Sequence, residues 1–163
     1  MLQIAAIAAS GVFIAAAVSD VATRRIPNWT VVAAVGLFAV QAAATPSAGI
    51  PWGALGVAGG VLAAGFLIFT FGAMGAGDAK LLSAVALWAG PPHGLAALIL
   101  VSFLGGIVAL IVVTLRNVAP VRILIERTAR RTVDVPDNVP YGVAIAAGGV
   151  FAAFARGGWV GGV

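Results

Sequence analysis

The chain has 163 residues, of which 62% are hydrophobic and only 9% are charged, so it is not an ordinary water-soluble domain and is expected to be a polytopic membrane protein. One histidine and no cysteine exclude a thiolate zinc site, a disulfide framework and a cysteine nucleophile. Any metal chemistry would need oxygen ligands alone, and we expect neither a metal nor a cofactor. The net charge of +4 does not indicate nucleic-acid binding, because the basic residues lie in loops without interleaved aromatic residues. Orientation in a membrane explains them better.

Six hydrophobic runs follow one another along the chain. They cover approximately residues 2–18, 29–44, 52–73, 79–90, 95–115 and 140–155, and turn or breaker residues, chiefly proline and glycine, separate them. A spanning helix uses about 20 apolar residues, so we expect an all-α bundle of about six transmembrane helices. This bundle would form a single integral membrane domain over residues 1–163. The first run lacks a basic segment before it and predicts a retained helix rather than a cleaved signal peptide.

The fourth run, residues 79–90, is the shortest. About 12 residues at about 1.5 Å per residue give a helix of about 18 Å, whereas the hydrocarbon core is about 30 Å thick. We expect a short span, extended through Pro91 and Pro92 or placed in a locally thinned bilayer. The alternative is a re-entrant segment, which would invert the topology of everything that follows.

The distribution of charge predicts the orientation of the bundle. Connections one, three and five contain eight of the nine basic residues, namely Arg24, Arg25, Lys80, Arg116, Arg122, Arg127, Arg130 and Arg131. The positive-inside rule places these connections in the cytoplasm and both termini outside. The stretch Val121–Arg131 mixes apolar and basic residues and predicts an interfacial helix on anionic membrane lipid.

Small and aromatic residues within the runs have structural interpretations. We expect the glycine pairs to allow close packing of helices; they are Gly56 and Gly60, Gly105 and Gly106, and Gly148 and Gly149. The tryptophans lie near the ends of runs, where an indole ring prefers the headgroup level; they are Trp29, Trp52, Trp88 and Trp159. No inverted pair of broken helices, of the kind that marks transporters, is present in the sequence.

Two aspartates are the main candidates for chemistry. Asp20 follows the first run, and Asp78 ends Gly75-Ala76-Gly77-Asp78. A carboxylate at a membrane boundary is costly unless it has a partner or a function. Gly75 and Gly77 would let an extended substrate approach Asp78, although Asp78 could instead be the N-cap of a helix. Asp20 could instead mark the membrane edge, paired with Arg24.

The two aspartates together suggest acid–base catalysis. Two carboxylates within a few ångströms of each other cannot both ionise cheaply, so one stays protonated while the other is charged. The charged one could activate a water and the protonated one could assist the carbonyl and the leaving amine of a peptide. Which aspartate has which role stays open. We interpret the other acidic residues, Glu126, Asp134 and Asp137, as solvated partners of nearby arginines, and we assign no role to His93.

Two stretches resemble signature sequences of the prepilin peptidases, membrane aspartyl proteases of the GxGD class. They are Asp-Val-Ala-Thr-Arg-Arg-Ile-Pro-Asn at residues 20–28 and Gly-Ala-Gly-Asp-Ala-Lys at residues 75–80, and Pro140-Tyr141-Gly142 also resembles a segment of that family. The resemblance implies that Asp20 and Asp78 are catalytic, in an enzyme of the bacterial inner membrane that faces the cytoplasm. Its partners would be prepilins or pseudopilins, cleaved after a glycine that ends a short basic leader.

The resemblance also bears on the neighbouring residues. Arg24, Arg25 and Lys80 fit as charge partners that hold an aspartate ionised, although anchoring on the inner membrane face explains them equally well. Pro27 and Asn28 are expected to end one helix and start the next. The chain lacks the cysteine pairs of larger family members that also methylate the new terminus, so methyltransferase activity is not expected. It resembles the short form found with Flp or tight-adherence pili.

Two other classes of function remain as alternatives. A small proton- or cation-coupled transporter would place both aspartates near the middle of the membrane. A non-catalytic subunit of a pilus or secretion assembly would use the aspartates only to cap and anchor helices.

Overall fold

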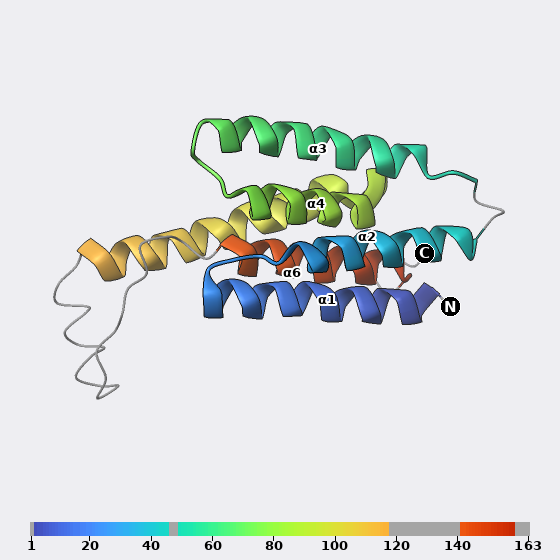
Figure 1. Cartoon of the computed structure of the whole chain (residues 1–163), viewed down its shortest axis with the longest axis horizontal. Helices are drawn as coiled ribbons and strands as arrows, with labels where there is room; N and C mark the ends of the chain where they lie inside the picture. The colour runs from blue at the N-terminus through green and yellow to red at the C-terminus, as the bar shows by residue number, and fades with distance from the viewer. Residues whose placement is uncertain (1, 46–48, 118–140, 159–163) are drawn as a thin grey trace.

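The computed structural model describes residues 2–45, 49–117 and 141–158, which contain five helices and no strand. The helices are α1 (Leu2–Thr23), α2 (Asn28–Ala43), α3 (Trp52–Thr70), α4 (Ala76–Asn117) and α6 (Tyr141–Arg156) (Figure 1). An apolar chain in lipid must satisfy its backbone hydrogen bonds internally, and helices do so within each segment. The predicted all-α bundle is confirmed, and the helices coincide with the predicted runs to within a few residues.

Helix α4 consists of two helical segments that run in opposite directions (Figure 1). The reversal is at Gly90, whose backbone angles (φ 61°, ψ −172°) are not helical, and Pro91 and Pro92 follow it directly. A positive φ is accessible to glycine without the steric cost of a side chain. The short fourth run therefore ends at Gly90. The predicted extension of this run through Pro91 and Pro92 is wrong.

The first segment of α4 runs antiparallel to α3. A Cβ atom built on Gly65 would lie 3.0 Å from the Cβ of Ala79, and one on Gly53 would lie 2.8 Å from Cγ of Pro91. The segment thus follows α3 along most of its length, from the end of the bundle that contains Asp78 to the opposite end.

Three helices contain a stretch with the length and apolar composition needed to cross a membrane: Gln3–Thr23, Trp52–Thr70 and Ala76–Leu115, the last of which includes the reversal at Gly90. Helices α2 and α6 are apolar but have only 16 residues each. A membrane protein is supported, but the prediction of six spanning helices is not confirmed. The six runs correspond to six helical segments, two of which are joined in α4.

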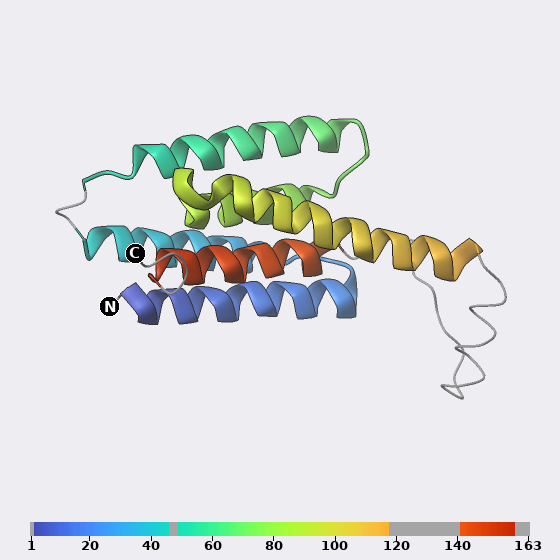
Figure 2. The ribbon, with the colours of Figure 1, turned by 180° about the vertical axis from the view of Figure 1, so that it is seen from behind.

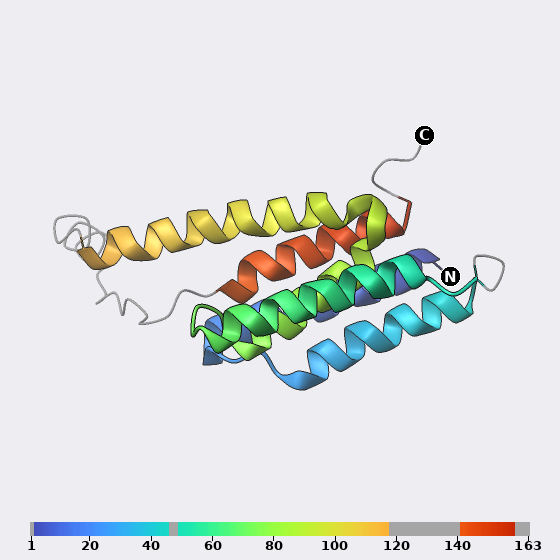
Figure 3. The same ribbon diagram turned by 90° about the horizontal axis from the view of Figure 1, so that it is seen from above.

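Helix α6 is the most buried element, and it packs against α1 and α4 (Figures 2 and 3). Its glycines make this contact possible. A Cβ on Gly149 would lie 2.5 Å from the Phe13 ring, and a Cβ on Gly148 would overlap Val101. The predicted packing role is confirmed for these two glycines and for Gly105, where a Cβ would lie 3.4 Å from the Tyr141 ring.

The packing prediction is wrong for Gly56, Gly60 and Gly106 within this chain, since a Cβ on any of them would meet no described atom within 4 Å. All three glycines are exposed, and Gly106 lines a cavity beside Tyr141.

Trp88 also differs from its prediction. Its side chain is fully buried, and its Nε1 donates a hydrogen bond to the carbonyl oxygen of Ala34 at 2.9 Å. It is therefore a core residue that joins α4 to α2, not a headgroup anchor. Trp29 and Trp52 lie near the starts of their helices with 57% and 70% of their surface exposed, and Trp159 lies outside the described residues.

Candidate active site

Asp20 lies in the last turn of α1, and only 7% of its surface is exposed. The backbone N–H of Gly142 donates a hydrogen bond to Oδ2 of Asp20 at 2.9 Å. Gly142 is the second residue of α6, so the carboxylate satisfies a backbone donor that the helix itself cannot satisfy. An acidic side chain in this place also complements the partial positive charge of the helix start.

Gly142 comes very close to the Asp20 side chain. A Cβ built on Gly142 would lie 2.6 Å from Oδ2, 2.7 Å from Cγ and 2.8 Å from Cβ of Asp20. No residue other than glycine fits at position 142 without moving α1, α6 or the aspartate. The position of the Asp20 carboxylate is therefore fixed by a contact with the backbone of α6.

Arg24 follows the end of α1, and its side chain is exposed. Its backbone N–H donates to the carbonyl oxygen of Asp20 at 2.9 Å, and its charge acts on the Asp20 carboxylate. The predicted pairing of Asp20 with Arg24 is thus present as an electrostatic interaction. Arg24 also has a left-handed backbone, with φ 55°.

Asp78 lies in the first turn of α4 and is half-buried. Helix α4 begins at Ala76, so Asp78 is its third residue and the alternative interpretation as the N-cap is wrong. The carboxylate instead accepts a hydrogen bond from the backbone N–H of Gly75. This is the contact that an acidic residue makes in a capping box, where it reaches back to the residue before the helix.

Both glycines before Asp78 are closely approached. A Cβ on Gly75 would lie 2.9 Å from Oδ2 of Asp78, and a Cβ on Gly77 would lie 3.1 Å from the Cβ of Ile26. Gly75 therefore leaves room for the carboxylate, and Gly77 leaves room for the connection between α1 and α2. The chain's own residues therefore take up part of the room beside both glycines, and the approach of a substrate to Asp78 stays a prediction.

The two aspartates line the same cavity, of about 350 Å³, although they come from helices that are far apart in the sequence. The other lining residues are Arg24, Gly72, Ala73, Met74, Gly75 and Tyr141. A neighbouring cavity of about 340 Å³ is also lined by both aspartates, together with Arg25 and Ile26. The negative charge of Asp20 acts directly on Asp78, so the two carboxylates form an electrostatically coupled pair.

The aspartate pair lies at one end of the bundle. This end contains the end of α1 and the starts of α2, α4 and α6 (Figure 1). A transporter that carries a cation on these carboxylates would place them near the middle of the helices, which the arrangement does not favour.

Lys80 has a different contact from the one predicted. Its Nζ donates a hydrogen bond to Oδ1 of Asn28 at 3.3 Å, so its side chain connects the start of α4 to the start of α2. Helix α2 begins at Asn28 after Pro27, which confirms the predicted helix boundary. Arg25 lines only the second of the two cavities.

The site also contains residues that the sequence did not indicate as candidates. Gly142 contacts Asp20, and Tyr141 and Met74 line the cavity. The segment Pro140-Tyr141-Gly142 resembles a family segment, but this resemblance does not predict which residue the segment contacts.

Some predictions concern other parts of the chain. His93 lies in α4 just after the reversal, at the end opposite the aspartates. No group of three or more histidine, cysteine, aspartate or glutamate residues in the described ranges could hold a metal ion. Glu126, Asp134, Asp137 and the predicted interfacial helix at 121–131 lie outside the described residues.

The chain matches a family of known proteins. The model of the type IV leader peptidase family matches residues 7–110, a range that includes both aspartates. No curated protein and no solved structure matches the chain significantly.

Proposed function

This chain belongs to the type IV leader peptidase family, and on that premise we propose that it is a membrane aspartic endopeptidase that removes the leader peptide from prepilins or pseudopilins of the Flp type. The observation that carries the proposal is the convergence of Asp20 and Asp78 on one cavity at one end of an apolar bundle. Methylation of the new terminus is not part of the proposal, because the cysteine pairs of larger family members are absent.

In the proposed reaction the two carboxylates share one proton. The ionised carboxylate removes a proton from a water as the water oxygen bonds to the carbonyl carbon of the scissile peptide. The protonated carboxylate donates a hydrogen bond to the carbonyl oxygen. The C–N bond then breaks as a proton passes to the leaving amine, so that water has supplied the hydroxyl of one product and the proton of the other. The roles belong to the pair as a unit.

Arg24 supports the site in this proposal. A left-handed backbone costs a residue with a side chain about 1–2 kcal/mol, and Arg24 has this backbone at a place where glycine would adopt it freely. A side chain kept at such a cost indicates a use for that side chain. We assign to the guanidinium group the electrostatic support of the Asp20 carboxylate.

We further propose that the aspartate end of the bundle faces the cytoplasm in a bacterial inner membrane and that residues 1–163 form a single domain. Arg24, Arg25 and Lys80 lie at the aspartate end, whereas Arg156 lies at the end of α6, on the opposite side. This asymmetry follows the positive-inside rule.

The catalytic roles are tested by co-expression with an Flp-type prepilin. Asp20→Asn and Asp78→Asn keep the size of each side chain and remove its charge and its proton. Each should abolish release of the leader, measured by the mass and the N-terminal sequence of the product. Asp137→Asn, which makes the same chemical change in the fifth connection, should leave cleavage intact. Cleavage by either of the first two variants, inserted at normal levels, would contradict the proposed pair.

The orientation is tested separately. Since the chain contains no cysteine, single cysteines report on accessibility without a background. Thr23→Cys, at the aspartate end, should react with a membrane-impermeant maleimide only from the cytoplasmic side. Ile50→Cys, in the connection between α2 and α3, should react only from the outside. The reverse pattern would contradict the proposed orientation.

A further inference from the structure

Helix α3 lies at the periphery of the bundle (Figure 1). It packs against α4 and against no other helix in the described ranges, and only Ala54, Ala58 and Gly65 among its residues are buried. The remaining surface carries no charge, since positions 26–77 contain no charged residue. Because lipid surrounds such a surface in a membrane protein, α3 faces acyl chains along its length.

Exposed aromatic rings mark both ends of α3. Trp52, its first residue, has 70% of its surface exposed, and Phe71, the residue after its last, has 79% exposed. These two residues are about 28 Å apart along a helix that rises about 1.5 Å per residue, and the hydrocarbon core of a bilayer is about 30 Å thick. A ring at either end therefore reaches the boundary between acyl chains and headgroups.

The backbone around Phe71 is fixed to the end of α3. Gly72 follows Phe71 with a positive φ of 74°. The backbone N–H of Gly72 donates to the carbonyl oxygen of Phe69 at 2.9 Å. The backbone N–H of Ala73 donates to the carbonyl oxygen of Ile68 at 3.2 Å. These two bonds form a Schellman motif, which fixes the direction in which the chain leaves the helix.

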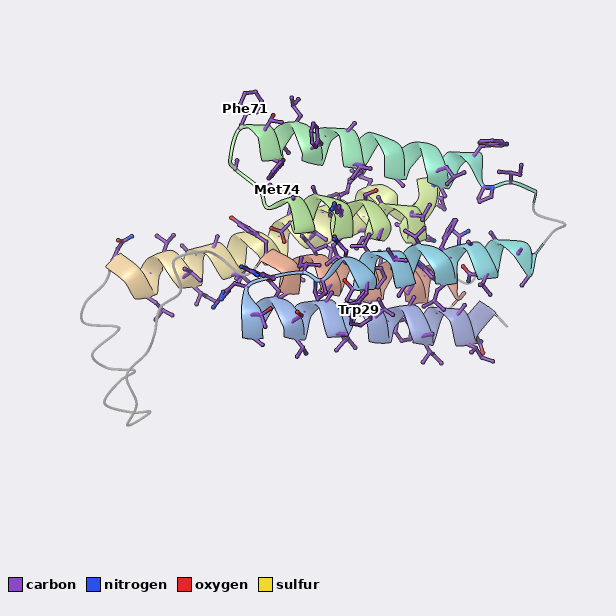
Figure 4. The ribbon with its side chains drawn as sticks, in the orientation of Figure 1. Trp29, Phe71 and Met74 are labelled. Atoms are coloured by element: carbon purple, nitrogen blue, oxygen red, sulfur yellow. The ribbon has the colours of Figure 1, made fainter. Side chains whose placement is uncertain are left out.

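The connection that follows forms one wall of the aspartate cavity. Its residues 72–75 all line that cavity, and the backbone N–H of Gly75 donates to the Asp78 carboxylate. Phe71 points away from the helices, whereas Met74 lines the cavity (Figure 4). Three residues along the chain thus separate a side chain that faces lipid from one that faces the aspartates.

We propose that Phe71 anchors this connection in the lipid layer, at the boundary between acyl chains and headgroups, so that the bilayer holds one wall of the aspartate cavity in place. Phospholipid is the partner of the ring, because the ring continues a helix surface of membrane-spanning length that no other described helix than α4 contacts. The effect of the anchor on cleavage rests on the leader peptidase function proposed above, whereas its contact with lipid does not.

The contact with lipid is measured with single cysteines, since the chain contains none. Phe71→Cys and Phe66→Cys each receive a fluorophore, in vesicles of phosphatidylethanolamine and phosphatidylglycerol. Phe66 is also exposed on α3, and it lies about 7.5 Å deeper along the helix. Lipids with a nitroxide near the headgroup should quench the label at position 71 more strongly. Lipids with a nitroxide at the end of the acyl chain should quench the label at position 66 more strongly.

Cleavage of an Flp-type prepilin measures the consequence for the site. In the same vesicles, Phe71→Ala should lower the rate by about threefold to tenfold, which is less than the loss of about 100-fold for a catalytic group misplaced by about 1 Å. Phe71→Leu keeps a large apolar side chain and should cleave like the unchanged protein. In detergent micelles, which adapt to the shape of the protein, Phe71→Ala should also cleave like the unchanged protein.

Phe66→Ala is the matched control. It removes the same ring from the same exposed helix, but Phe66 lines neither cavity of the aspartates. This variant should cleave the prepilin like the unchanged protein in vesicles and in micelles.

Two results of the quenching measurement would overturn the proposal. One is a label at position 71 that iodide in the water quenches and lipid nitroxides do not. The other is protection of this label that increases with protein density, since a second copy of the chain would then cover the ring.

Equal loss of cleavage by Phe71→Ala in micelles and vesicles, no loss in either, or the same loss in Phe66→Ala would also overturn the proposal. Failure of the leader peptidase function has a different signature. The quenching pattern would then hold, but the unchanged protein would release no leader in either medium.

Discussion

Replacement of Gly142 by alanine should slow cleavage while the protein stays folded, because the new methyl group would collide with the Asp20 carboxylate. The Cβ would lie 2.7 Å from Cγ of Asp20, whereas nonbonded carbon atoms need a separation of about 3.5 Å. Either the carboxylate or α6 must therefore move by about 0.8 Å. A shift of about 1 Å in a catalytic group can cost about 100-fold in rate, and we expect a loss of this order in the cleavage of a prepilin by Gly142→Ala.

The measurement is a time course of leader release by the purified enzyme in detergent, together with its thermal unfolding. Alanine in place of glycine within a helix is by itself stabilising, by up to about 1 kcal/mol, so the change in helix propensity does not explain a loss of activity. Gly36→Ala makes the same change where a Cβ would meet no atom within 4 Å, and it should cleave normally. The reasoning is refuted if Gly142→Ala cleaves the precursor at the rate of the unchanged protein.

Three further changes have distinct expected outcomes. Lys80→Ala should keep cleavage within about threefold, because an exposed side chain contributes little through such a contact; a loss of about 100-fold in the same assay would instead support the predicted role as charge partner of an aspartate. Gly77→Val should lower the unfolding temperature and reduce the free energy of unfolding by about 1–3 kcal/mol, because the new valine side chain would collide with Ile26. An unchanged unfolding temperature would contradict this prediction. Arg156→Met should lower the free energy of unfolding by about 2–3 kcal/mol, because it removes a charged hydrogen bond of 2.8 Å to Gln41. The double variant with Gln41→Leu should recover much of this lost stability. Cleavage should survive in the double variant, and failure to recover stability would show that the pair is not the cause.

The prediction for Arg156 concerns a polar cluster inside the end of the bundle opposite the aspartates. The guanidinium donates to Oε1 of Gln41 and to the carbonyl oxygen of Trp88, and it lies 4.4 Å from the centre of the Phe38 ring. Gln41 is 3% exposed, and its Nε2 has no partner among the described atoms. Removal of one member leaves buried polar groups unpaired, whereas apolar replacement of both removes the need for a partner.

The sequence was sufficient to predict the helices and the end of the bundle at which the aspartates lie. Apolar runs interrupted by proline and glycine determine where helices begin and end in a chain of this composition, because lipid leaves the backbone few other ways to satisfy its hydrogen bonds. The number of connections between Asp20 and Asp78 then places both residues at the same end. The structure agrees in that both line one cavity.

The contacts that fix each side chain could not be predicted. Asp20 and Gly142 are 122 residues apart, and no local pattern relates them. The position of Trp88 near the end of a run predicts the membrane surface, but its side chain is buried and bonds to Ala34 of α2, just before the reversal at Gly90. The role of Arg156 was missed for a similar reason, since its partners come from α2 and α4. Packing between distant segments decides these cases, and local propensity does not.

The two aspartates are held by the same kind of contact, which explains how an apolar bundle keeps two acidic side chains around one cavity. Each carboxylate accepts a backbone N–H at the start of a helix, Asp20 from Gly142 in α6 and Asp78 from Gly75 before α4. Helix starts carry partial positive charge and unsatisfied donors, so the two helices compensate part of the cost of bringing like charges together. The same contacts fix the carboxylates to the backbone of separate helices. A relative movement of α4 and α6 would therefore change the separation of the pair directly, and the precision of the site depends on the glycines that let these helices pack so closely.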